Sequence, residues 1–115
     1  MRRAIFTPVH HDVVTGERWV TVGFNLEESY YKELERRIDG EQSEYLRKVV
    51  VKHLKRKPLS SAFPFSTYVQ GERFRLLRFK LKDQDRRRLE QRARTCGVYL
   101  SVYLRGVVVK HLRRE

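Results

Sequence analysis

Side chains that can bind phosphate are the most prominent chemical feature of this chain. Of 115 residues, 26 are Lys or Arg and 14 are Asp or Glu, which gives a formal net charge of +12. Arg outnumbers Lys 18 to 8, and the planar guanidinium donates two parallel hydrogen bonds to phosphate or guanine. A charge of this size indicates nucleic acid or an anionic membrane surface as the partner.

The basic residues are unevenly distributed along the chain. Residues 1–58 hold 12 basic and 9 acidic side chains, whereas residues 59–115 hold 14 and 5. We therefore expect the second half to carry more of any phosphate binding.

The sequence offers no catalytic or metal-binding pattern. Six Tyr and many Arg invite a nuclease or integrase interpretation, but no carboxylate cluster and no His-Arg-Tyr set stand at suggestive spacing. His10 and His11 lack a Cys or a second His pair nearby, so a surface arm is favoured over a metal site. We expect no enzymatic activity, no metal, no cofactor and no small-molecule ligand.

Cysteine usage and hydropathy place the chain in a broad class. The single Cys96 excludes an internal disulfide, and neither a signal sequence nor a run of about 18 apolar residues occurs. We expect no membrane partner and a cytoplasmic, nucleoid-associated protein, or one in the host cytoplasm if the source is viral.

One segment of the sequence occurs twice. Residues 49–54 and 107–112 both read Val-Val-Val-Lys-His-Leu, at an offset of 58 residues. Upstream, residues 24–26 are echoed by residues 79–81 at an offset of 55, so three extra residues precede Ser101 in the second copy. Each copy is too small to bury much core alone, so two copies are expected to fold on each other.

The copies share a predicted strand followed by two helices. Residues 19–26 alternate with period two, which is typical of a half-buried strand. Helices are predicted to open at residues 27–29 and 82–85, to end at Gly40 and Gly97, and to be followed by helices reaching Arg56 and Arg114. Ser43 and Ser101 are the predicted caps of these last helices.

The last helix of each copy is predicted to be central to the core. Three consecutive Val residues have mediocre helix propensity, but a broad apolar stripe outweighs this preference through burial. In the first copy that stripe consists of Leu46, Val49, Val50, His53 and Leu54.

The remaining segments are an arm and a linker. Residues 1–18 form an N-terminal arm that contains Pro8 and is predicted to make a short hairpin with the segment after residue 18. Residues 58–71 are a linker rich in Pro, Ser and aromatic residues, and it is predicted to pack along the surface. The arm precedes a first unit at 19–57, and the linker precedes a second at 72–115.

The ordered set of strand, helix, Gly-containing turn and helix resembles the ribbon-helix-helix family, the class of the Arc and Met repressors. The residues that carry the resemblance are 22–26 with 43–47 and 78–81 with 97–104. The first copy departs from the family pattern, since residues 39–42 leave a connection three residues shorter than usual. The resemblance implies a mainly α fold with a two-stranded antiparallel β-ribbon, in which two units form an intramolecular pseudo-dimer. Tandem members occur among plasmid transfer proteins and archaeal viruses.

The resemblance also implies which residues would contact DNA. The ribbon would enter the major groove, which is wide enough for two strands. Base contacts would come from Thr21, Gly23, Asn25, Leu76, Arg78 and Lys80. Phosphate contacts would come from Ser43, Arg47, Ser101 and Arg105 at the helix N-termini and from Arg2 and Arg3 in the arm.

Two functions remain open, both with double-stranded DNA as the partner. The first is a sequence-specific transcriptional regulator such as a repressor, and the alternative is an architectural or packaging protein with low sequence preference, which could self-associate along DNA in a nucleoprotein. An antitoxin or nickel sensor is not expected, because such relatives carry a further tail or domain and this sequence stops at Glu115.

Overall fold

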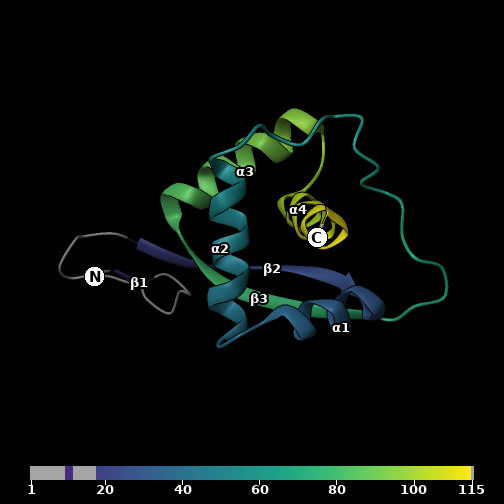
Figure 1. The fold of residues 1–115 in the computed structure, drawn as a ribbon. Coiled ribbons are helices and arrows are strands. Elements are labelled where there is room, and N and C mark those ends of the chain that lie inside the picture. Colours follow the sequence, from purple (N-terminus) through teal and green to yellow (C-terminus); the bar gives the residue numbers. More distant parts are fainter. Residues whose placement is uncertain (1–9, 12–17, 115) are drawn as a thin grey trace.

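The computed structural model describes residues 10–11 and 18–114, with side chains from 18 to 113 (Figure 1). Most of the predicted arm, including Arg2 and Arg3, lies outside these residues. Two long strands and four helices follow a short first strand. Their bounds are β1 His10–His11, β2 Arg18–Glu27, α1 Glu28–Arg37, α2 Gln42–Leu54, β3 Phe74–Lys82, α3 Asp83–Cys96 and α4 Leu100–Arg114.

The two long strands pair as an antiparallel ribbon. Their register runs without a break from Trp19 opposite Lys82 to Glu27 opposite Phe74. This confirms the predicted mainly α fold with a two-stranded ribbon. The short strand β1 pairs with the start of β2, in agreement with the short hairpin predicted between the arm and the segment after it. His10 and His11 of β1 pair with Trp19 and Arg18 along the outer edge of β2, where that strand would otherwise present unpaired backbone groups.

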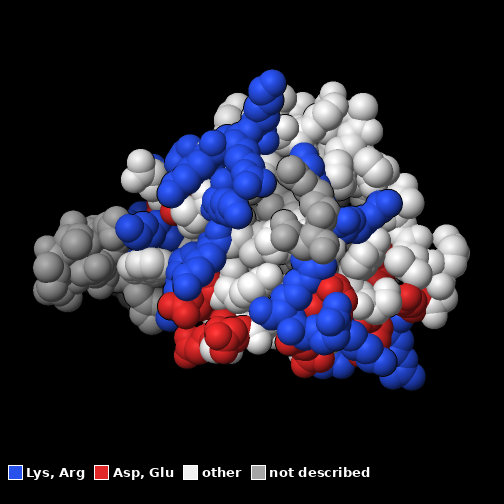
Figure 2. Space-filling view, viewed as in Figure 1, with Lys and Arg blue, Asp and Glu red and all other residues white. Residues whose placement is uncertain are grey.

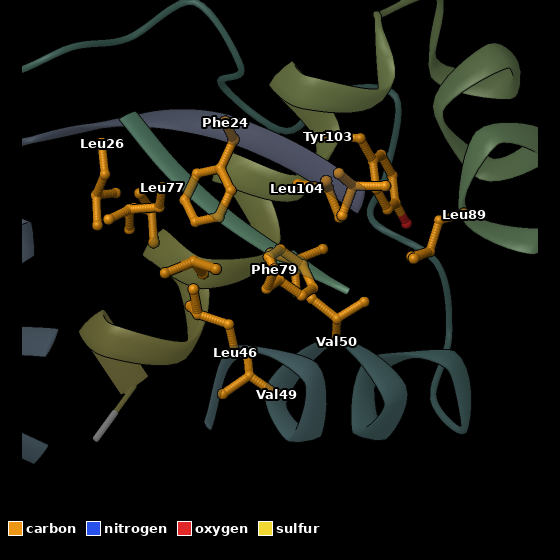
Figure 3. Close-up of a cluster of buried hydrophobic side chains, with 14 of the residues drawn as sticks. Phe24, Leu26, Leu46, Val49, Val50, Leu77, Phe79, Leu89, Tyr103 and Leu104 are labelled. Atoms are coloured by element: carbon orange, nitrogen blue, oxygen red, sulfur yellow. The ribbon is translucent and has the colours of Figure 1, made fainter. Parts of the chain in front are cut away.

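The apolar face of the ribbon forms the floor of the core (Figure 3). As the alternation predicts, Val22, Phe24, Leu77 and Phe79 are buried, and the rings of Phe24 and Phe79 meet edge to face at 6.3 Å between centroids. Helix α4 packs on β2 and helix α2 packs on β3. Each strand is therefore covered by the last helix of the other copy, which explains why neither copy needs a core of its own.

The predicted starts of α1 and α3 and the predicted ends of α3 and α4 are correct, whereas other helix boundaries are not. Gly97 closes α3 in the left-handed conformation (φ +73°), and the predicted stripe of α2 is buried in full. Helix α1 ends at Arg37, before Gly40, because Ile38 is already extended; an early end agrees with the short connection of the first copy. Gly40 lies in the following turn at φ +108°, and α2 ends at Leu54.

The predicted capping roles of Ser43 and Ser101 are wrong. Hydrogen bonding in α2 begins at the carbonyl of Glu41, and that in α4 begins at the carbonyl of Tyr99. Both serines therefore lie inside the first turn, where their backbone N–H groups still lack an intrahelical acceptor.

The connection between the copies packs against the rest of the molecule, as predicted, and the element that it covers is α4. Leu59 and Phe65 are buried, and a Cβ added at Gly106 would lie 3.0 Å from Phe65 and 3.2 Å from Leu59. Lys48 occupies the corresponding place in α2 and is exposed. The missing side chain at Gly106 thus lets the linker approach α4 closely, which buries this helix on most sides.

Several polar contacts join equivalent positions of the two copies. His53 Nε2 lies 2.8 Å from the Tyr103 hydroxyl, and the Tyr45 hydroxyl lies 3.1 Å from His111 Nε2. Each Tyr and each His stands 58 residues from its counterpart. Both His residues therefore pack against a Tyr of the other copy.

Arginines of the first helices repeat this exchange of contacts. Arg37 donates to the carbonyl of Leu112 at 2.9 Å, and Arg92 donates to the carbonyl of Leu54 at 3.1 Å. Each arginine thereby satisfies carbonyls at the C-terminus of the last helix in the other copy.

His53 is expected to make stability depend on pH. Burial, followed by the charges of Arg92, Lys110 and Arg56, lowers the pKa of His53 from 6.5 to about 4. The unfolded chain therefore binds the proton more readily, so stability is complete above pH 6.5 and declines as the pH falls towards 4. Between pH 7.5 and pH 5 the free energy of unfolding should fall by about 2 kcal/mol, measured by urea denaturation.

The control for this prediction is His53→Gln, whose side-chain carbonyl can still accept from the Tyr103 hydroxyl without titrating. Its stability should change less over the same pH interval. Equal losses in the variant and the parent chain would contradict the role assigned to His53.

Candidate nucleic-acid interface

The outer face of the ribbon brings together all six residues predicted to contact bases. Thr21 lies opposite Lys80, Gly23 opposite Arg78, and Asn25 opposite Leu76. All are exposed except Gly23, which is half-buried. We call these six residues the ribbon face. It offers an amide, a guanidinium, an ammonium, a hydroxyl and an apolar side chain on one continuous surface.

The two cations of the ribbon face are free to bind a partner. Within the described part of the chain, no ion pair is formed by Arg78 or Lys80. Arg75 on the same strand differs, since its guanidinium lies 4.2 Å from the centre of the Tyr31 ring and 3.6 Å from Glu28. Arg75 is therefore held by contacts within the protein, whereas Arg78 and Lys80 on the other face of the ribbon are not held by an ion pair with any described residue.

Helix α2 provides a cationic surface beside the ribbon. The guanidinium of Arg47 donates to the Lys80 carbonyl at 3.3 Å and lies 5.4 Å from the centre of the Trp19 ring. Lys82 approaches the same ring from β3, at 5.8 Å. A hollow of about 400 Å³ here is lined by Trp19, Arg47, Lys48, Val51, Lys52, Lys55, Lys82 and Asp85. We call this surface the α2 flank, and Figure 2 shows Lys and Arg side chains running along α2.

The equivalent surface at α4 is different, and the predicted phosphate contact of Arg105 is wrong. Arg105 is buried and makes two hydrogen bonds to the carboxylate of Glu27, at 2.9 and 2.6 Å. It also donates to the Thr67 carbonyl at 3.0 Å and lies 4.3 Å from the Tyr68 ring centre. Arg105 is therefore a core residue whose charge is satisfied inside the protein.

The partner of Arg105 explains why the two copies differ. Glu27 stands at the end of β2, where β3 has Lys82. Burial alone would raise the pKa of Glu27, but hydrogen bonds from Arg105 and from the N–H of Val69 hold it below its usual value. For Arg47 of the first copy, the residue in the place of Glu27 is Lys82, which is not acidic. Arg47 therefore stays at the surface. The difference between Glu27 and Lys82 at equivalent positions is the feature of the sequence that distinguishes the surroundings of Arg105 from those of Arg47.

The surface beside α4 is consequently more apolar. A hollow of about 420 Å³ lies beside the first turn of α4, where Ser101 is exposed. Its lining includes Asn25 of the ribbon face and the linker. Tyr68, Val69 and Phe74 are exposed here. Sequence reasoning missed these residues, as it missed Trp19 and Lys82 at the α2 flank.

The described residues contain no group of three or more His, Cys, Asp and Glu side chains that could hold a metal ion. None of the helices described here is long and apolar enough to cross a membrane. Comparisons of the chain with protein-family models, with curated proteins and with solved structures gave no match.

Proposed function

We propose that this chain is a single-chain ribbon-helix-helix protein that binds double-stranded DNA through the ribbon face and regulates transcription. The observation that carries the proposal is the strand register. Gly23 lies opposite Arg78, its own counterpart 55 residues further on. At the same offset, Thr21 corresponds to Leu76 and Asn25 corresponds to Lys80. A two-fold axis between Gly23 and Arg78 therefore maps the pair Thr21–Lys80 onto the pair Leu76–Asn25. Such exchange is the property of an isologous dimer interface.

The helices support the same pseudo-dimer. The His–Tyr contacts and the arginine contacts to helix carbonyls each occur twice, with the copies exchanged. The units proposed are residues 19–57 and 72–115, although the first strand begins at Arg18.

The ribbon face has chemistry that suits the major groove. A two-stranded ribbon fits this groove, where Asn reads adenine, Arg or Lys reads guanine, and an apolar side chain contacts the thymine methyl. The first-turn amides near Ser43 and the cations of the α2 flank would bind phosphates on one side. Since Arg105 is buried in the core, we propose that phosphate binding is weaker on the α4 side. This differs from the expectation based on the larger net charge of the second half.

A binding selection tests this proposal. Because Thr21, Gly23 and Asn25 differ from Leu76, Arg78 and Lys80, a duplex bound by one chain should have a non-palindromic core sequence. Selection from random duplexes at near-physiological salt should return such a site. Recovery of perfect inverted repeats for a single chain would contradict the proposed recognition of bases by unlike strands.

An architectural role is the second candidate, favoured by cations outside the ribbon face, such as those along α2. Competition between selected and random duplexes separates the two roles. For a regulator we expect the selected site to bind at least about 10³-fold more tightly. A much smaller ratio would favour coating of DNA with little sequence preference.

A further inference from the structure

A second cationic hollow lies between α2 and α4. It has a volume of about 210 Å³ and is lined by Val49, Lys52, His53, Arg56, Lys57, Val107, Lys110 and His111. Three residues of α2 in this lining recur in α4 at an offset of 58. We call it the axial hollow, because its paired lining places it on the proposed two-fold axis.

The axial hollow lies on the far side of the helices from the ribbon face. The axis passes between Gly23 and Arg78 in the ribbon, whose inner face packs on α2 and α4. In the view of Figure 1, α2 crosses in front of both strands. A duplex bound to the ribbon face would therefore lie on the other side of α2 and α4 from the axial hollow.

The described lining of the axial hollow is cationic. Four of the described lining residues are Lys or Arg, and no described lining residue is acidic. Lys52, Arg56, Lys57 and Lys110 are all exposed, and none forms an ion pair with a described residue. Carbonyl groups at the C-terminus of a helix are favourable partners for cations. The Leu54 carbonyl of α2 already accepts hydrogen bonds from Arg92 and Arg88, and the Leu112 carbonyl of α4 accepts one from Arg37. These carbonyls therefore already have partners other than the cations of the hollow.

The lowered pKa of His53 reflects the same cationic charges. After burial, the charges that oppose protonation of this imidazole come from Arg92, Lys110 and Arg56, and they contribute to a pKa of about 4. Two of these three residues line the axial hollow. An anion in the hollow would relieve this repulsion, whereas a neutral ligand would not.

We propose that the axial hollow binds phosphate groups, and that with one duplex on the ribbon face it takes the backbone of a second duplex, so that one chain bridges two DNAs. The lining favours phosphate because its cations are gathered around a small concave surface with Val49 and Val107 as its apolar part. Bridging rests on the proposed function, but phosphate binding by the hollow does not.

The bridging experiment uses one duplex fixed to beads and a second, fluorescent duplex in solution. The full chain should retain the fluorescent duplex on the beads. Arg56→Ala combined with Lys110→Ala, two exposed residues of the axial hollow that are not part of the α2 flank, should reduce retention at least tenfold, while affinity for a single duplex changes less than threefold. Lys32→Ala combined with Arg94→Ala removes the same charge from exposed positions of α1 and α3 and should retain the second duplex. Equal retention by all three proteins, or none by the unmodified chain, would overturn bridging.

A second measurement tests the hollow without DNA. Inorganic pyrophosphate should shift the imidazole NMR signals of His53 and His111 in the full chain. The shift should be absent from the Arg56→Ala, Lys110→Ala variant, whose folding is checked by its melting temperature. No shift in the full chain would overturn the phosphate site. A shift without retention of a second duplex would assign the hollow to a free phosphate compound and overturn bridging alone.

Discussion

Replacing Arg105 by Met is expected to lower the free energy of unfolding by about 3–5 kcal/mol, because Glu27 would be left as a buried charge without its partner. Glu27 is 0% exposed and Arg105 is 5% exposed, so water cannot take over the lost hydrogen bonds. Urea denaturation at pH 7 measures the loss.

Arg47→Met is the matched control for this change. Arg47 is the counterpart of Arg105 at an offset of 58, but it is half-buried and its hydrogen bond is to the Lys80 carbonyl. Its replacement should cost about 1 kcal/mol or less in stability and should weaken DNA binding instead. Equal loss of stability in the two variants would contradict the buried ion pair. Glu27→Leu combined with Arg105→Met should recover part of the loss, since neither charge remains.

Replacing Arg78 by Ala is expected to weaken binding to the selected DNA site by about 1–3 kcal/mol, or roughly 5- to 150-fold. The variant should also lose discrimination at one base pair near the centre of the site. The reason is that Arg78 lies at the middle of the ribbon face, opposite Gly23. Equilibrium binding to the selected duplex and to its single-base variants measures both effects.

The control for Arg78 is Arg75→Ala on the same strand. It removes the same charge, but its guanidinium packs on Tyr31 and pairs with Glu28 rather than lying on the ribbon face. This variant should bind somewhat more weakly to all duplexes and keep the preference at every position. Loss of preference in Arg75→Ala, or its retention in Arg78→Ala, would show that the ribbon face does not read bases.

The ribbon could be predicted from the sequence because its information is local and repeated. Period-two alternation assigns Phe24 and Phe79 to the buried face and Asn25 and Lys80 to the exposed face. The repeat then predicts that the two strands fold on each other. The broad stripe of α2 was predictable for a similar reason, since the spacing of its apolar residues outweighs the low helix propensity of Val.

The burial of Arg105 could not be predicted from the residues around it in the sequence. It depends on a carboxylate 78 residues away and on linker residues that cover both. Arg47 and Arg105 occupy the same place in the repeat, and only their tertiary partners separate them. The starts of α2 and α4 could not be predicted for a smaller reason. Glu41 and Tyr99 accept the first helical hydrogen bonds, and neither is a Ser, Thr, Asp or Asn, the residues that usually cap a helix.

The direct test of the central proposal asks which groove of DNA the chain occupies. Binding to the selected duplex is compared with binding to two modified duplexes, one with bulky groups on pyrimidine C5 in the major groove and one with methyl groups on guanine N2 in the minor groove. A ribbon in the major groove predicts at least tenfold weaker binding to the first and nearly unchanged binding to the second. Unchanged binding to the first duplex would contradict entry of β2 and β3 into the major groove.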